Sequence, residues 1–312
     1  MRGVVVKSTG SWYDVKTENG EVVKCRIRGV FRIDDTKEKY SNPVAVGDLV
    51  EILNEGGPDG WVISAIEPRH NYIVRSSPRH RGARQILAAN IDQCVLIVTL
   101  IQPRTSTGFI DRFLLTAEAY HIPTIIVFNK TDLLDEKNMY KLESIAQIYR
   151  QIGYRVLFVS ALKKLGMSEF VEALRNKITL LAGHSGVGKS TLMNTIQPHL
   201  HLRTQEVSRI TGKGMHTTTF AEMHFLDFGG SVIDAPGIRE FGITDFKPEE
   251  ISHYYIEMRE VLQGCKFNNC LHENEPECAV KKAYLAGKIS EERYTNYLNI
   301  LQDYRANYRH WE

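Results

Sequence analysis

The stretch Gly183-His184-Ser185-Gly186-Val187-Gly188-Lys189-Ser190 decides the fold of this 312-residue chain. It matches the pattern G-x4-G-K-[ST], comes directly after the apolar run 178–182, and leads through Thr191 into helical sequence. Glycines let the backbone curl so that successive N–H groups point at phosphate oxygens, and the following helix adds partial positive charge. We therefore predict that residues 183–191 bind nucleotide phosphates, with Lys189 acting on the β- and γ-phosphates and Ser190 coordinating Mg²⁺.

A second motif predicts the base of that nucleotide. Asn129-Lys130-Thr131-Asp132 follows the apolar run 124–128 and matches N-K-x-D. A carboxylate at Asp132 can accept hydrogen bonds from the ring nitrogen and the exocyclic amine of guanine, a donor pair that adenine lacks. Ser160-Ala161, after the run 156–159, fits the short loop that supports the base. We therefore expect GTP and GDP as ligands.

Two later segments are candidates for sensing the terminal phosphate. Asp234-Ala235-Pro236-Gly237 ends a predicted strand and fits D-x-x-G, in which Asp234 would hold Mg²⁺ through water and the Gly237 N–H would contact the γ-phosphate. The stretch 214–219 offers a threonine to complete the Mg²⁺ shell. We select Thr218 for this catalytic role, although the spacing does not exclude its neighbours.

The residue after D-x-x-G bears on the rate of hydrolysis. Many GTPases have a glutamine there that orients the attacking water, whereas this chain has Ile238. We expect slow intrinsic hydrolysis for that reason. His216, beside the threonines, is a candidate catalytic substitute, because histidine is the commonest acid–base side chain; an exposed loop residue is the alternative interpretation.

The order of the motifs is unusual. Most GTPases have the phosphate-binding loop first, whereas here N-K-x-D and S-A precede it. Between 91 and 245, apolar β-branched runs alternate with helix-length amphipathic segments at about 109–120, 136–152 and 167–175, which is typical of an α/β domain with a mainly parallel sheet. We predict a circularly permuted P-loop GTPase domain.

The segments on either side of this domain have different residue patterns. Residues 1–70 contain short alternating segments separated by turn residues, which predict a five-stranded barrel of the OB or SH3 kind, used either for nucleic acid or for packing alone. Residues 71–90 are rich in arginine and are interpreted as a basic linker. Residues 246–312 are mainly helical and too few to be stabilised comfortably by core burial alone.

A cluster of metal-ligand residues lies in the C-terminal segment. Its spacing is C-x4-C-x-H-x5-C, and its members are Cys265, Cys270, His272 and Cys278. Four such ligands close a tetrahedron and leave no position for substrate, so we predict one structural Zn²⁺ ion. Cys25 and Cys94 lie in strand-like sequence and are expected to be buried.

Composition narrows the class of protein. The formal net charge is only +2, and none of the apolar runs approaches the roughly 20 residues that a membrane span requires. No secretory signal is evident at the N-terminus, and five cysteines without one indicate thiols or metal ligands. We expect a cytoplasmic monomer.

The motifs, their order, the preceding barrel and the following cysteine cluster together resemble the RsgA (YjeQ) family of circularly permuted GTPases over nearly the whole chain. The resemblance implies an OB-like barrel and a zinc domain that contact rRNA. It also implies a GTPase that acts late in maturation of the small (30S) ribosomal subunit, whose hydrolysis of GTP is stimulated by that subunit and coupled to release. His216 matches the histidine proposed to act in hydrolysis there.

Two other functions are alternatives on these motifs. A nucleotide-gated module that binds some other RNA shares the same motifs and would differ in which RNA stimulates turnover. An ATP-dependent metabolic enzyme is disfavoured by Asp132 and by the lack of an obvious second substrate pocket.

Overall fold

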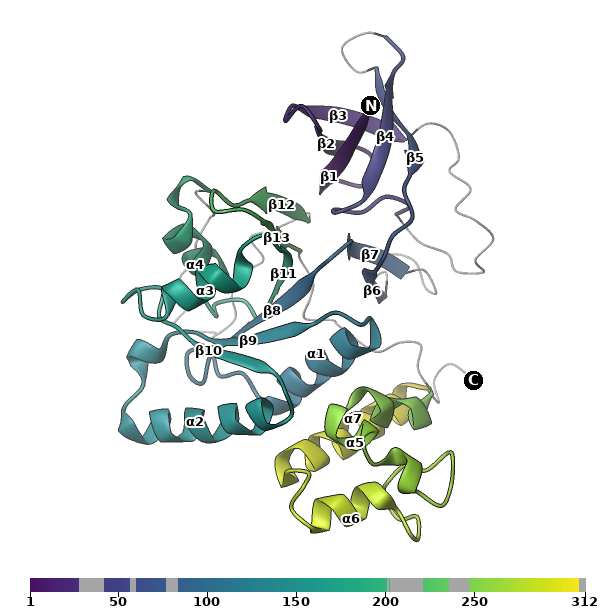
Figure 1. The fold of residues 1–312 in the computed structure, drawn as a ribbon, viewed down its shortest axis with the longest axis vertical. Helices are drawn as coiled ribbons and strands as arrows, with labels where there is room; N and C mark the ends of the chain where they lie inside the picture. The colour runs from purple at the N-terminus through teal and green to yellow at the C-terminus, as the bar shows by residue number, and fades with distance from the viewer. Residues whose placement is uncertain are drawn as a thin grey trace.

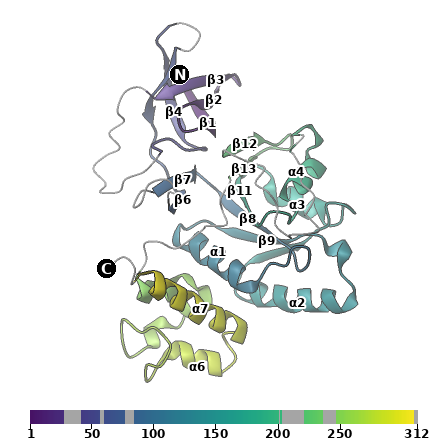
Figure 2. The ribbon, with the colours of Figure 1, turned by 180° about the vertical axis from the view of Figure 1, so that it is seen from behind.

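The computed structural model describes residues 1–27, 42–56, 60–76, 84–200, 202, 221–235 and 247–308. These residues form a β-barrel, a central α/β domain and a helical C-terminal unit, arranged in chain order (Figure 1). The reverse view shows the barrel next to strand β12 and the helical unit next to helix α1 (Figure 2). Among the helices in these ranges, we find none with the length and hydropathy of a membrane span.

The N-terminal barrel has the strand order β1-β2-β3-β5-β4, and β4 closes it by pairing with β1. Its core consists of side chains that alternate along the strands, such as Val5, Tyr13 and Ile63. A closed five-stranded barrel of this order confirms the OB-like prediction. The strands are β1 Arg2–Ser8, β2 Tyr13–Thr17, β3 Val22–Ile27, β4 Leu49–Asn54 and β5 Trp61–Ile66.

The central sheet continues from the barrel in the order β10-β9-β8-β11-β13-β12. All its pairings are parallel except that of β12 with β13. The strands β8, β9 and β10 precede β11 in sequence and lie on one side of it, so the predicted permutation of the α/β domain is confirmed. The strands are β8 Gln93–Val98, β9 Thr124–Phe128, β10 Arg155–Phe158, β11 Ile178–Ala182, β12 Glu222–Phe225 and β13 Ser231–Asp234.

Helices cover both faces of the central sheet because the strand residues are apolar on both sides. In β8, Leu96 and Val98 pack with α1 and α2, whereas Val95 and Ile97 pack with α3 and α4. Ser106 caps α1 by accepting a hydrogen bond from the Phe109 N–H. The helices are α1 Thr107–Ala119, α2 Glu136–Gln151, α3 Met167–Leu174 and α4 Lys189–Ile196, with the short 3-10 turns Thr131–Leu133 and Pro198–Leu200.

The segment 71–90, interpreted above as a basic linker, carries regular structure. Strands β6 (Tyr72–Ser76) and β7 (Arg84–Ala89) form an antiparallel hairpin. The apolar β7 residues Ile86 and Leu87 are buried, which the high arginine content of the segment concealed. The described part of the hairpin therefore packs into the protein core.

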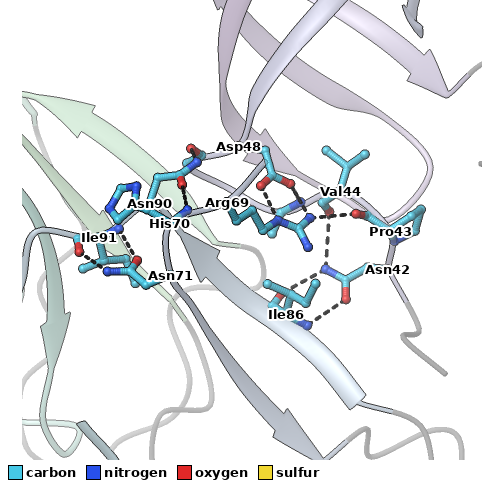
Figure 3. A network of polar contacts seen from close by, with 12 residues as sticks. Asn42, Pro43, Val44, Asp48, Arg69, His70, Asn71, Ile86, Asn90 and Ile91 are labelled. Atoms are coloured by element: carbon cyan, nitrogen blue, oxygen red, sulfur yellow. Dashed lines mark hydrogen bonds and ion pairs between the residues drawn. The ribbon is translucent and has the colours of Figure 1, made fainter. Parts of the chain in front are cut away.

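Polar side chains fix this hairpin to the barrel (Figure 3). Asp48 accepts two hydrogen bonds from the guanidinium of Arg69, each 2.6 Å long, and Asp48 is fully buried.

Three asparagine side chains bond to backbone groups in the same region. Asn42 bonds both the N–H and the C=O of Ile86, as a neighbouring strand would. Asn71 likewise bonds both the N–H and the C=O of Ile91, and the Asn90 side chain donates to the Gly47 carbonyl. Backbone groups left without strand partners are thus satisfied by asparagine side chains.

The C-terminal unit is mainly helical, as predicted. Its core contains Tyr255, Tyr297 and Leu301 together with two of the cysteines, and it incorporates Leu115 from helix α1. The α/β domain therefore contributes directly to the core of this unit. Its elements are the 3-10 helix Pro248–Tyr254, α5 Ile256–Arg259, the 3-10 turn Leu262–Gly264, α6 Ala279–Leu285 and α7 Glu291–Tyr308.

Candidate functional site

The loop between β11 and α4 has the backbone conformation that its glycines predict. Gly183, Gly186 and Gly188 have φ values of +137°, +83° and +96°, which residues other than glycine rarely adopt. A Cβ atom on Gly183 would lie 2.2 Å from the carbonyl oxygen of Ile97. The loop therefore curls tightly against β8 and ends in the first turn of α4.

Asn129 joins three of the predicted motifs. Its side-chain nitrogen donates to the Val187 carbonyl at 2.8 Å, and its side-chain oxygen accepts from the Ala161 N–H at 3.3 Å. Asn129 is 4% exposed. A Cβ atom on Gly188 would lie 2.4 Å from that same amide nitrogen, so only glycine fits there. The N-K-x-D, S-A and phosphate-binding loops thus meet at one buried amide.

The remaining residues of N-K-x-D are anchored by the neighbouring loop. Thr131 donates to the Val159 carbonyl at 3.0 Å, and Asp132 accepts from the hydroxyl of Ser160 at 2.5 Å. Ser160 is fully buried and also accepts from the Lys163 N–H. The S-A loop therefore holds the carboxylate of Asp132 in place.

Lys130 lies beside the phosphate-binding loop. Its backbone is left-handed, with φ of +64°, and its ammonium group donates to the Gln102 carbonyl at 2.6 Å. Burial lowers the pKa of Lys130, and the nearby Asp132 carboxylate opposes that shift. The Cε atom of Lys130 lies 3.9 Å from the position that a Cβ atom on Gly188 would take.

Lys189, Ser190, Thr191 and Asp234 lie at or beyond the carboxyl ends of the neighbouring parallel strands β11 and β13. The ammonium of Lys189 donates to the carbonyls of Gly183 and His184, at 2.8 and 3.1 Å. Ser190 and Thr191 lie in the first turn of α4. Asp234 ends β13, in register with Leu181 of the neighbouring β11, and is partly exposed. An ammonium, a hydroxyl and a carboxylate at one sheet edge are the groups that Mg²⁺ and phosphate need.

Three predicted residues lie outside the part of the chain that the structure describes. They are His216, Thr218 and Gly237. Their assigned roles stay predictions.

Two residues that sequence reasoning missed contact the loops of the site. Gln102 supplies the carbonyl that binds Lys130, and the ring of Phe109 lies 3.8 Å from that of His184, centroid to centroid. Both follow the carboxyl end of β8. The rule that sites in α/β folds form at this edge could have found them, although neither belongs to a motif.

The four predicted zinc ligands converge in the C-terminal unit. Their ligand atoms all lie within 4.8 Å of one another, and Nδ1 of His272 is 3.7 Å from Sγ of Cys265 and 3.3 Å from Sγ of Cys278. A tetrahedron with ordinary Zn–S and Zn–N bonds has S···N edges of about 3.5 Å. The residues therefore fit one Zn²⁺ ion.

The protonation chemistry of this cluster also suits a cation. Burial lowers the pKa of His272 to about 4, which leaves the imidazole neutral, the form that ligates metals. Burial raises the pKa of the Cys270 thiol to about 12, so a bound cation is what would stabilise its thiolate. The loop itself is held by Tyr294 and Tyr297, whose hydroxyls donate to the carbonyls of His272 and Leu271.

A phosphate-binding loop joined through Asn129 to base-recognition motifs that precede it in sequence defines a circularly permuted P-loop GTPase domain. The RsgA GTPase family model matches residues 66–244, and the RsgA N-terminal domain model matches residues 2–62. The chain belongs to the RsgA GTPase family. It is accordingly a GTP hydrolase that uses GTP, GDP and Mg²⁺.

The similarity to several known proteins covers nearly the whole chain. "Small ribosomal subunit biogenesis GTPase RsgA" of Bacteroides fragilis (strain YCH46) is 50% identical, covering 99% of this chain and 100% of its own length. The protein of that name from Flavobacterium psychrophilum is 48% identical, covering 99% and 95%. The crystal structure of YjeQ from Thermotoga maritima has a TM-score of 0.77 at 36% identity, covering 97% and 98%. YloQ, described as a circularly permuted GTPase, has a TM-score of 0.72 at 31% identity, covering 98% and 95%.

Proposed function

We propose that this GTPase acts in late maturation of the small ribosomal subunit, that it binds the rRNA of that subunit as a monomer, and that the subunit stimulates GTP hydrolysis, which drives release. The observation that carries this proposal is full-length similarity, at 50% identity, to a protein named for biogenesis of that subunit. The similarity includes the barrel and the zinc-site segment, which a nucleotide site alone would not require.

Guanine recognition is assigned to the loops that meet at Asn129. Asp132 would accept hydrogen bonds from the ring nitrogen and the exocyclic amine of guanine, while Ser160 keeps its carboxylate oriented. Lys130 and Thr131 would shape the pocket, and the Ala161 N–H would support the base. Adenine lacks the donor pair that guanine offers to the Asp132 carboxylate, which disfavours ATP.

Phosphate binding and hydrolysis are assigned to the opposite end. The backbone N–H groups of residues 183–191 would surround the phosphates, and Lys189 would exchange its loop carbonyls for β- and γ-phosphate oxygens. Ser190, Thr218 and Asp234 would hold Mg²⁺, directly or through water, and Gly237 would contact the γ-phosphate. His216 would orient the attacking water when the small subunit is bound.

One experiment tests the partner. GTP turnover is measured with purified small subunits, large subunits and bulk RNA at matched phosphate concentration and at two salt concentrations. We expect strong stimulation by small subunits only. Equal stimulation by all three, falling steeply with salt, would instead identify generic polyanion binding.

A second experiment tests the site. Asp132→Asn should shift preference from guanosine toward xanthosine nucleotides, and Lys189→Ala should abolish hydrolysis. Lys163→Ala, next to the S-A loop but with its backbone N–H retained, is the matched control. Unchanged GTP use by Asp132→Asn would refute the assigned base recognition.

A further inference from the structure

Helix α1 contacts both the phosphate-binding loop and the C-terminal unit. We propose that the docked C-terminal unit holds the phosphate-binding loop in its nucleotide-binding conformation through α1, with Phe109 as the positioning residue. The inference rests on the assignment of residues 183–191 to phosphate binding.

Phe109 reaches the loop through an aromatic contact. Its ring and that of His184 lie 3.8 Å apart between centroids, with an angle of 32° between their planes. His184 is the second residue of the loop, and its carbonyl accepts hydrogen bonds from Lys189 and from the Val187 N–H. Holding the His184 ring therefore constrains the backbone that faces the phosphates.

A buried charge cluster joins α1 to the C-terminal unit. Asp111, fully buried on α1, accepts hydrogen bonds at 2.7 Å from Arg293 and Asn296 of α7. The same guanidinium donates to both carboxylate oxygens of Glu257, at 2.7 and 3.0 Å, and is 3% exposed. The hydroxyl of Tyr149, on α2, donates to Asp111 as well. Charges this deeply buried persist only with their partners, so α1 and α7 are fixed relative to each other.

The first turn of α1, which carries Phe109, is itself in contact with α7. The hydroxyl of Thr107 donates to Glu292 at 2.6 Å, and the Cβ position of Gly108 is 3.4 Å from the side-chain oxygen of Asn296. Further along the helix, Leu115 inserts into the C-terminal core. Contacts with the C-terminal unit thus lie on both sides of Phe109 in sequence, and a shift of α7 would move the ring.

A purely structural interface would hold the C-terminal unit against the GTPase domain and leave the phosphate-binding loop unaffected. The two possibilities differ in nucleotide affinity. If α1 transmits the docking, loosening the charge cluster weakens nucleotide binding even though no cluster residue belongs to the nucleotide site. If it does not, the affinity stays constant while the stability of the C-terminal unit falls.

The test measures the dissociation constant of a fluorescent GDP analogue for the full-length, zinc-loaded protein at low temperature. The variants are Arg293→Met, Phe109→Leu and the double variant. The matched control is Arg112→Met, because Arg112 pairs with Asp303 between the same two helices but in an exposed position, with side chains 39% and 58% exposed. Circular dichroism and zinc content verify folding, and Asp111→Asn replaces Arg293→Met if that variant does not fold.

We expect each single variant to weaken binding by about fivefold to tenfold, as expected for loss of an aromatic contact. The double variant should be no weaker than the weaker single variant, because both act through one contact. The control should bind within twofold of the unmodified protein. Unchanged affinity in Arg293→Met or Asp111→Asn, or multiplicative losses in the double variant, would overturn the inference. Failure of the unmodified protein to bind the analogue would instead refute the assigned nucleotide site.

Discussion

Two junctions, one between the barrel and the β6–β7 hairpin and one between the GTPase domain and the C-terminal unit, both use a buried arginine–carboxylate contact, but they are assembled differently. At the barrel junction, Arg69 and Asp48 are 21 residues apart, and the asparagine bonds around them span at most 44 residues. At the C-terminal junction, Arg293 and Asp111 are 182 residues apart. The barrel junction can therefore form from one continuous segment of chain, whereas the C-terminal junction requires a folded α1.

The largest expected effect separates the junctions by their dependence on metal. Chelating zinc should unfold the C-terminal unit, because a structural zinc site contributes about 10 kcal/mol or more to the folding of its domain. Loss of helical circular dichroism and new protease cleavage within 247–308 would show this, with re-added zinc as the control. The barrel should stay resistant. A C-terminal unit that survives chelation would contradict the prediction.

The next effect concerns the C-terminal charge cluster. Arg293→Ala leaves the Asp111 and Glu257 carboxylates buried without their cation and should cost about 3–5 kcal/mol of unfolding free energy. Urea denaturation of the zinc-loaded protein measures the loss. Arg112→Ala removes an exposed pair between the same helices and should cost at most about 1 kcal/mol. Similar losses in both variants would mean that burial does not decide the strength of this junction.

The barrel junction should respond somewhat less. Asp48→Ala should cost about 3 kcal/mol, the lower end of the range for broken buried pairs, because the Arg69 side chain keeps 14% exposure and can reach water. Trp12 and Trp61 lie in the barrel, so fluorescence in a Trp311→Phe background follows its unfolding. An unchanged denaturation midpoint would contradict the prediction.

The smallest effect is expected where the barrel meets the GTPase sheet. Lys7 of β1 pairs with Glu222 of β12 at 3.1 Å, with side chains 35% and 39% exposed. Lys7→Ala should cost about 0.5 kcal/mol or less, since exposed pairs contribute little. The same denaturation experiment detects it at low and high salt. A loss above about 1 kcal/mol would contradict the prediction that this exposed pair contributes little.

Sequence predicted those parts of the molecule that depend on local pattern. Strands 124–128 and 178–182 appear in the structure with the predicted bounds, because apolar β-branched runs bounded by turns are typical of buried strands. The zinc ligands were found because their spacing alone brings them together. The meeting of the loops at Asn129 was implied only by their positions at strand ends.

The parts that sequence could not predict depend on partners far away in the chain. Arg69 belongs to no motif, and no local pattern indicates that it is paired with a buried carboxylate 21 residues earlier in the chain. Asp111 had no visible role, because its partner lies on the last helix. Asn42, Asn71 and Asn90 replace strand neighbours, which no local pattern encodes. The domain boundaries at 70, 90 and 245 stay predictions.

The pairing of β1 with β12 has a consequence for solubility. A strand at the edge of a sheet offers unpaired N–H and C=O groups to other copies of the chain and so favours aggregation. Here the outer strand β12 of the GTPase sheet is met by the barrel, and the barrel closes upon itself. At the far end, β10 is only four residues long, begins with an exposed Arg155, and has Arg150 positioned over Phe158. A chain stripped of its barrel would present β12 to its neighbours and should precipitate more readily than the intact protein.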